Sequence, residues 1–132
     1  MITMIQRVEG GAIAVAALVA AIVLQPAWWW VPLAAFLLFD LSMVGYLRSP
    51  ALGAAVYNCV HTYVWPALAT VVAIVTASSS PAVSGAATLV AASWALHVGV
   101  DRAIGAGLKH PDSFGHTHLG SPPGPASVRT AV

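Results

Sequence analysis

The chain has 132 residues, of which 59% are hydrophobic and 7% are charged, and its mean hydropathy is +0.86. Soluble domains carry about 25% charged residues, so this composition excludes an ordinary soluble domain and indicates a membrane protein. The formal net charge of +1 comes from widely spaced basic residues, which excludes a nucleic-acid-binding protein, and the one cysteine excludes an internal disulfide framework.

Four apolar stretches are long enough to form membrane-spanning helices, each of which needs about 20 apolar residues. In chain order they are residues 10–28, 30–47, 52–76 and 82–108. Because none of them alternates in polarity as a strand would, we predict an all-α fold, an integral membrane four-helix bundle over residues 1–109. Residues 110–120 are predicted to be a cytoplasmic segment that folds back on the bundle, and residues 121–132 a disordered tail.

The basic residues indicate how the spans are oriented. They are Arg7, Arg48, Arg102, Lys109 and Arg129. In a four-span chain all of them fall on one side, which the positive-inside rule identifies as the cytoplasm. Trp28, Trp29 and Trp30 would then anchor the opposite interface. The sequence thus predicts a multi-pass protein of the cell inner membrane with both termini in the cytoplasm.

Four ionisable residues interrupt the apolar stretches: Asp40, His61, His97 and Asp101. Such groups are costly in hydrocarbon unless they are paired or hydrated, so they mark candidate functional sites. The depth of each group in the membrane can be estimated from the number of residues between it and the basic residue at the end of its span, at about 1.5 Å per helical residue. By this count the two carboxylates lie at the same depth and the two imidazoles slightly deeper. We therefore predict that these side chains meet in one pocket that opens toward the cytoplasm.

The third stretch adds polar groups to this pocket. Tyr57 and Asn58 precede His61 by four and three residues, so all three share a helix face. Pro66 is predicted to kink the same helix and to free carbonyl groups near His61.

Several strings in the chain point to a known family. They are Arg7-Val8-Glu9-Gly10, Asp40-Leu41-Ser42-Met43-Val44-Gly45-Tyr46, Tyr57-Asn58-x-x-His61-Thr62-Tyr63, His97-x-x-x-Asp101-Arg102, Gly105-x-Gly107-Leu108-Lys109 and Phe114-x-x-Thr117-His118-Leu119-Gly120. Together they resemble the small bacterial membrane proteins grouped as domain of unknown function 4260, over residues 7–120. The resemblance implies a compact multi-helix membrane protein and no settled activity.

The sharpest interpretation of the four ionisable residues is a metal site. Carboxylates and imidazoles on neighbouring helices are suitable ligands for zinc, iron or manganese. The predicted ligands and acid–base groups are Asp40, His61, His97 and Asp101. Further residues are predicted to add ligands, orient the ligands or contact substrate: Glu9, Tyr46, Tyr57, Asn58, Arg102 and His118.

Other interpretations of these residues remain open. They could form a hydrogen-bonded structural core, a proton or cation relay, a ligand-binding site, or a haem site between His61 and His97. The leading hypothesis is a membrane-embedded enzyme, metal-dependent and hydrolase-like, that acts on a lipid or another lipophilic small molecule. A homo-oligomer is one possibility, because a single four-helix bundle encloses little volume.

Overall fold

A computed structural model describes residues 1–120 and contains only helices, turns and loops over that range. The helical elements are α1 (Ile2–Leu24), α2 (Val31–Ala34), the 3₁₀ helix η1 (Phe36–Leu47), α3 (Pro50–Val60), α4 (Val64–Thr76) and α5 (Pro81–Ile104). The predicted all-α class is confirmed for the described residues. Three stretches are long and apolar enough to cross a membrane, namely Ile2–Leu24, Pro50–Thr76 and Pro81–Ile104.

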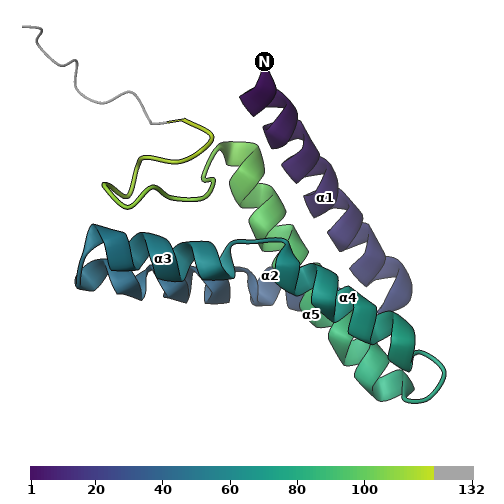
Figure 1. Ribbon diagram of the computed structural model, residues 1–132. Coiled ribbons are helices and arrows are strands. Elements are labelled where there is room, and N and C mark those ends of the chain that lie inside the picture. The colour runs from purple at the N-terminus through teal and green to yellow at the C-terminus, as the bar shows by residue number, and fades with distance from the viewer. Residues whose placement is uncertain (121–132) are drawn as a thin grey trace, which may run out of the picture.

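Helix α5 is the centre of the fold, and α1 and α4 pack along it (Figure 1). The antiparallel contact between α1 and α5 depends on glycine at two positions. A Cβ at Gly10 would overlap the Cβ of Arg102, and a Cβ at Gly99 would lie 2.7 Å from the carbonyl oxygen of Gly10. Small residues allow this approach, which is how helices associate where apolar burial alone gives no driving force.

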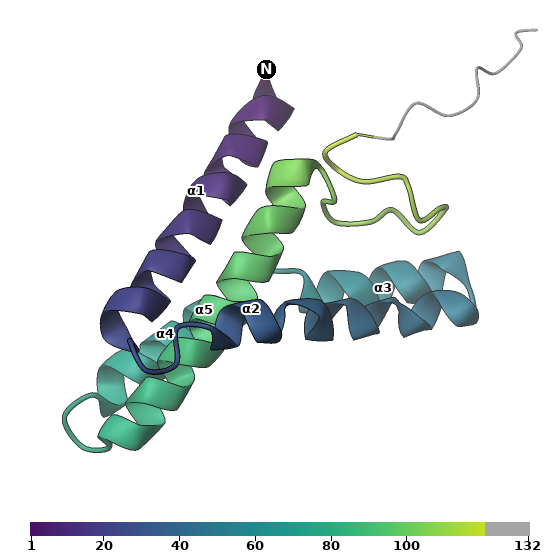
Figure 2. The same ribbon diagram turned by 180° about the vertical axis from the view of Figure 1, so that it is seen from behind.

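The second predicted span is helical and apolar but shorter than the other three. Residues 30–47 form the short helix α2 and then η1, and Val31–Leu47 falls below the length of the three spanning candidates. Together η1 and α3 make a hairpin, the side arm, which projects from the middle of α5 at a steep angle instead of running beside it (Figures 1 and 2).

The sequence of η1 has a period that suits a 3₁₀ helix. In a 3₁₀ helix residues three apart eclipse one another, so each face is a row with a period of three. One row faces the rest of the protein and the opposite row is exposed. The inward row is Phe36, Phe39, Ser42 and Gly45, and the outward row is Leu38, Leu41, Val44 and Leu47. A helix with 3.6 residues per turn would rotate these rows away from α3 and α5.

The third predicted span, 52–76, is broken in the middle. Helix α3 ends at Val60, and α4 begins at Val64, two residues before Pro66. The predicted effect of Pro66 is confirmed, because the carbonyl groups freed at the break accept hydrogen bonds from side chains. The indole of Trp65 donates to the carbonyl of Cys59 at 2.7 Å, and the indole of Trp94 donates to that of Val60 at 2.7 Å.

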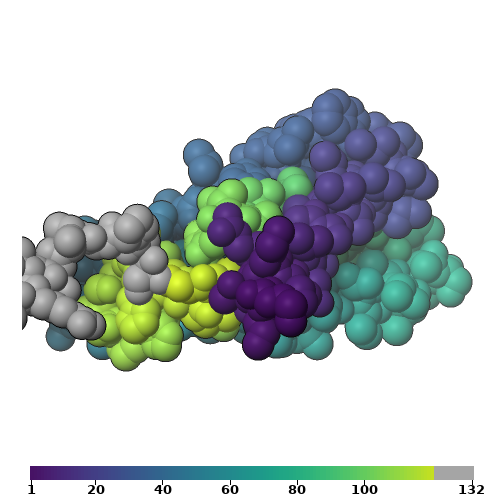
Figure 3. Space-filling model, turned by 90° about the horizontal axis from the view of Figure 1, so that it is seen from above, coloured from purple at the N-terminus to yellow at the C-terminus, as the bar shows by residue number. Residues whose placement is uncertain are grey.

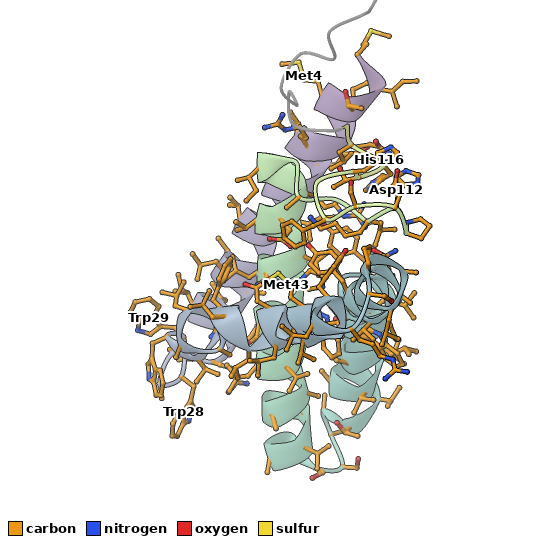
Figure 4. The ribbon with its side chains drawn as sticks, turned by 90° about the vertical axis from the view of Figure 1, so that its left-hand side faces the viewer. Met4, Trp28, Trp29, Met43, Asp112 and His116 are labelled. Atoms are coloured by element: carbon orange, nitrogen blue, oxygen red, sulfur yellow. The ribbon has the colours of Figure 1, made fainter. Side chains whose placement is uncertain are left out.

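The helix ends also differ from the predicted boundaries. Helix α1 starts at Ile2 and stops at Leu24, so the first span includes Arg7 and excludes the three tryptophans. Helix α5 ends at Ile104, because Gly105 adopts the left-handed conformation (φ 94°) that commonly terminates helices. The start of α1 and the end of α5 lie at the same end of the molecule, while Trp28 and Trp29 project near the other (Figures 1 and 4).

The segment after Gly105 returns over the side arm, beside the first turns of α1 (Figures 2 and 3). We call residues 105–120 the return segment. The carboxamide of Asn58 holds it by donating to the carbonyl of Lys109 at 2.9 Å and accepting from the amide of Lys109 at 2.7 Å. The predicted tail, residues 121–132, lies outside the described residues.

Candidate metal centre

Three elements bring the four predicted ligands together where the side arm meets α5. Asp40 projects from the middle of η1, and His61 caps the carboxyl end of α3. His97 and Asp101 lie one turn apart on α5. One potential ligand atom from each residue can be chosen so that all four lie within 4.8 Å of one another. We call these four residues the Asp/His cluster.

The two imidazoles are the closest pair in the cluster. Their Nε2 atoms are 2.9 Å apart. The carboxylate oxygens of Asp40 and Asp101 lie 3.5–3.8 Å from these nitrogens. Zinc bonds to nitrogen and oxygen of about 2.0–2.2 Å would place the ligand atoms of a tetrahedral site about 3.4 Å apart. The imidazole–carboxylate separations are thus close to those of a zinc site, whereas the two nitrogens would have to move apart and the widest pair, within 4.8 Å, would have to move closer together to share one ion.

The surroundings of His61 fix which of its nitrogens can bind an ion. Its Nδ1 donates to the carbonyl of Tyr57 at 2.9 Å, and the hydroxyl of Ser42 lies 3.5 Å away. A carbonyl can only accept, so in the neutral ring Nδ1 carries the proton and Nε2 offers a lone pair to the cluster. The ring of Tyr57 stacks on His61 at a centroid distance of 3.5 Å and limits its rotation.

His97 is fully buried and held by aromatic rings. The rings of Phe36 and Phe39, both from the inward row of η1, lie 4.8 and 5.2 Å from its ring centroid. Its Nδ1 is buried without a hydrogen-bond partner among residues 1–120. The position of His97 is therefore set by packing, which leaves Nε2 directed at His61.

The two carboxylates differ in exposure and in their partners. Asp101 is 13% exposed and accepts a hydrogen bond of 2.6 Å from the hydroxyl of Tyr57. Asp40 is 28% exposed, so the cluster is most accessible on its side. Asp101 is thus fixed in place, while Asp40 retains more freedom to adjust to an ion or a substrate.

Of the six predicted supporting residues, Tyr57 is in direct contact with the cluster, and Asn58 anchors the return segment beside it. Arg102 and His118 lie at its edge, with Arg102 Nη2 3.5 Å from the carbonyl oxygen of His61. Glu9 is different, because its side chain is exposed on α1 and makes no hydrogen bond or ion pair within the described part of the chain.

Tyr46 also has a different place from the one predicted. Its ring packs against Phe114 and fills the space over Gly53, where a Cβ would overlap it. Its hydroxyl is buried without a partner within residues 1–120. Tyr46 therefore fastens the return segment to the side arm through its ring.

Sequence reasoning missed Lys109, which it treated only as a marker of the membrane boundary. The side chain is 8% exposed, and its ammonium lies 4.2 Å from the ring centroid of Phe114 and 5.0 Å from that of Tyr57. Burial lowers the pKa of Lys109, while attraction to Asp101 and Asp40 opposes that shift. The signals in the sequence were its place after the glycines near the end of the last predicted span and its position in the string Gly105-x-Gly107-Leu108-Lys109.

The distance between the two imidazoles favours a single metal ion over a haem. A haem between His61 and His97 would need their Nε2 atoms about 4 Å apart, on opposite sides of a flat macrocycle, given iron–nitrogen bonds of about 2 Å. The observed 2.9 Å leaves no room for a porphyrin. Two nitrogens and two carboxylate oxygens suit a single divalent transition-metal ion better.

Comparison with known proteins gives a family and no function. The model of the family described as Domain of unknown function (DUF4260) matches residues 3–121, nearly the whole chain. No curated protein and no solved structure matches the chain.

Proposed function

The chain belongs to this family of unknown function, and we propose that it is a membrane-embedded, metal-dependent hydrolase whose ligands are Asp40, His61, His97 and Asp101. It would act on a lipophilic substrate that enters from the bilayer. We place the cluster toward the cytoplasmic face of the inner membrane, because Arg7 in the second turn of α1, Arg102 in the last turn of α5 and Lys109 after α5 lie at that end.

One observation carries the proposal: the approach of two imidazole Nε2 atoms to 2.9 Å between two carboxylates. If neither Nε2 carries a proton, two lone pairs face each other, which is unfavourable without a cation between them. If His97 Nε2 carries a proton, its buried Nδ1 lone pair has no donor among residues 1–120. A shared ion would use both Nε2 lone pairs and balance the carboxylate charges, and the N–H at Nδ1 of His97 would then be buried without an acceptor among residues 1–120.

The relay is a weaker explanation than a metal site. The orphaned Nδ1 of His97 does not separate a polar core from a metal site, because a metal on Nε2 would leave the N–H at Nδ1 without an acceptor within the described residues. A relay needs ionisable groups along its path, yet residues 10–39 and 64–96 contain no Asp, Glu, Lys, Arg or His. The cluster is therefore confined to one end of the helices, which suits a binding or catalytic site.

A divalent ion in this position would polarise an ester or phosphoryl oxygen and acidify a bound water for attack. The chain's own contribution is positioning. Tyr57 holds Asp101 and, through its carbonyl, His61. The partly exposed Asp40 leaves one side of the cluster open to water and substrate.

Metal content tests the first half of the proposal. We expect about one equivalent of a divalent transition metal in the detergent-purified full chain, measured by elemental analysis. His61→Gln and His97→Gln should each lose it, while His116→Gln should retain it because His116 lies on the exposed loop with Asp112 (Figure 4). Equal metal content in all four proteins, or none in any, would contradict the metal site.

Turnover tests the second half. The metal-loaded protein in mixed micelles should hydrolyse nitrophenyl esters or phosphodiesters that carry long acyl chains. Chelation and Asp40→Asn should both abolish the release of nitrophenol. Stoichiometric metal without turnover on either substrate class would favour a metal-binding or transport role.

A further inference from the structure

At the edge of the Asp/His cluster, two hydrogen-bond donors face each other with no acceptor between them. The Arg102 guanidinium Nη1 lies 2.7 Å from Nε2 of His118. The other ring nitrogen, Nδ1, accepts a hydrogen bond of 2.9 Å from the amide of Leu108. A neutral imidazole has one lone pair and one N–H, so it cannot accept at both nitrogens.

The backbone amide decides which nitrogen of His118 carries the proton. The amide of Leu108 can only donate, and the return segment holds it against the ring, because the amide of His118 also donates to the carbonyl of Leu108 at 3.0 Å. Nδ1 must therefore be the acceptor, and Nε2 carries the hydrogen. That N–H is directed at a guanidinium that also has only donors, so the contact is unfavourable as it stands.

Arg102 also lacks a carboxylate partner within residues 1–120. The chain has four acidic residues in all. Asp40 and Asp101 belong to the cluster, Asp112 pairs with His116 at 2.7 Å, and Glu9 is exposed on α1. Among residues 1–120, neither Arg102 nor Lys109 forms an ion pair with any of them.

A metal ion in the cluster would increase the excess of positive charge around Arg102 and Lys109. A divalent ion would cancel the charges of Asp40 and Asp101, which otherwise attract Lys109. Two partly buried cations would then remain beside the site without a counterion among residues 1–120, and buried charges are normally paired. Their remaining partners are uncharged, namely the His61 carbonyl for Arg102 and the rings of Phe114 and Tyr57 for Lys109.

We propose that Arg102 and His118 form a binding site for an oxyanion, the phosphate or carboxylate group of the substrate. One anionic oxygen would accept from both Nη1 of Arg102 and Nε2 of His118 once the Arg102 side chain moves back from the ring, because two donors to one oxygen lie farther apart than the present 2.7 Å. This inference rests on the proposed function and narrows its substrate to an anionic amphiphile, with the scissile bond at the metal and the charged group at Arg102 and His118.

Glycine at position 107 supports a built site. A Cβ at Gly107 would overlap the imidazole of His118. Glycine therefore leaves the space that the ring occupies beside Arg102.

The test compares four full-length proteins in detergent: wild type, Arg102→Gln, His118→Asn and Arg48→Gln. His118→Asn retains an oxygen that can accept from the Leu108 amide and removes the donor that faces Arg102. Arg48→Gln is the matched control, because it removes one positive charge from the exposed tip of the side arm. The probes are inorganic phosphate, followed by calorimetry, and phosphatidic acid in phosphatidylcholine micelles, followed by native mass spectrometry.

We expect Arg102→Gln and His118→Asn each to weaken binding about tenfold or more, and Arg48→Gln to match wild type, since charge-assisted hydrogen bonds are the strong ones. Loss for both probes, or for phosphatidic acid alone, assigns the site to a lipid head group. Loss for phosphate alone assigns it to a soluble anion. Equal affinities in all four proteins would overturn the inference.

Each titration is repeated after chelation, which separates the two proposals. Binding that survives chelation and still depends on Arg102 and His118 supports the oxyanion site, even in a protein that never takes up metal. Binding that vanishes on chelation and is insensitive to both substitutions places the anion on the metal. That result would overturn the inference and leave the metal site standing.

Discussion

At the scale of single residues, Tyr57 has the most connections to the cluster. Its carbonyl fixes the proton of His61, its ring stacks on the same imidazole, and its hydroxyl holds Asp101. Only the hydroxyl can be removed without altering the packing. Groups that orient ligands are commonly worth 10–100-fold in metal affinity.

Tyr57→Phe should therefore lower metal affinity roughly tenfold or more, with little change in the metal-free melting temperature. Competition with a chromogenic chelator measures the affinity. Tyr63→Phe is the matched control, because the Tyr63 hydroxyl is buried without a partner among residues 1–120. Its removal should leave metal affinity unchanged. Equal affinities for Tyr57→Phe and wild type would show that Asp101 needs no support.

His118 gives the return segment a pH dependence. Burial, and then the charge of Arg102, lower the pKa of His118 below its ordinary value of about 6.5. The opened segment therefore takes up a proton at a higher pH than the docked one. Docking is favoured above about pH 6.5 and weakens as the pH falls below it.

Hydrogen exchange of residues 105–120 should thus accelerate between pH 7.5 and 5.5, after correction for the intrinsic rates. The acceleration should be absent in His118→Asn, which cannot titrate in this range. An identical pH response in both proteins would assign the effect to another group.

At the scale of elements, the contact between α1 and α5 is decided by single Cβ atoms. Gly10→Ala should destabilise the protein by about 1–3 kcal/mol, the usual cost of overpacking, because its Cβ would overlap Arg102. Gly11→Ala is the control on the same helix, since its Cβ would meet Ala103 at an ordinary 3.7 Å. Thermal unfolding in detergent measures both. Equal melting temperatures would mean that α1 can shift without cost.

Asn58 joins the side arm to the return segment by bonding both backbone polar groups of Lys109. Asn58→Ala should therefore raise the exchange rate of the Lys109 amide by about tenfold or more, since hydrogen bonds of this kind are worth about 1 kcal/mol each. Cys59→Ala, at the neighbouring exposed position, should leave that rate unchanged. Unchanged exchange in both variants would show that other contacts dock the segment.

At the scale of the whole molecule, the placement of the cluster near one end gives a test of orientation. In a Cys59→Ser background, Ser79→Cys lies in the turn between α4 and α5, and Ser113→Cys in the return segment. With the return segment in the cytoplasm, an impermeant maleimide should label Ser79→Cys in intact cells. It should label Ser113→Cys only after permeabilisation. The reverse pattern would place the cluster on the outer face.

The sequence by itself determined the class of the protein and the residues that meet. The composition indicates a membrane protein, because the chain has too few polar side chains to give these helices a water-soluble surface. The cost of ionisable groups in hydrocarbon singled out Asp40, His61, His97 and Asp101, and the structure brings them together. Both inferences depend on solvent and residue type, which can be judged without a fold.

The tertiary structure decided the shape of the side arm and the environment of the cluster. The period of three in η1 is present in the sequence, but it becomes a 3₁₀ helix only because α3 and α5 bury one row. Lys109 and His118 gain their positions from Asn58, Arg102 and the Leu108 amide, some of which lie far away in the chain. Such contacts are non-local, so residue type and spacing cannot specify them, and only the packed fold does.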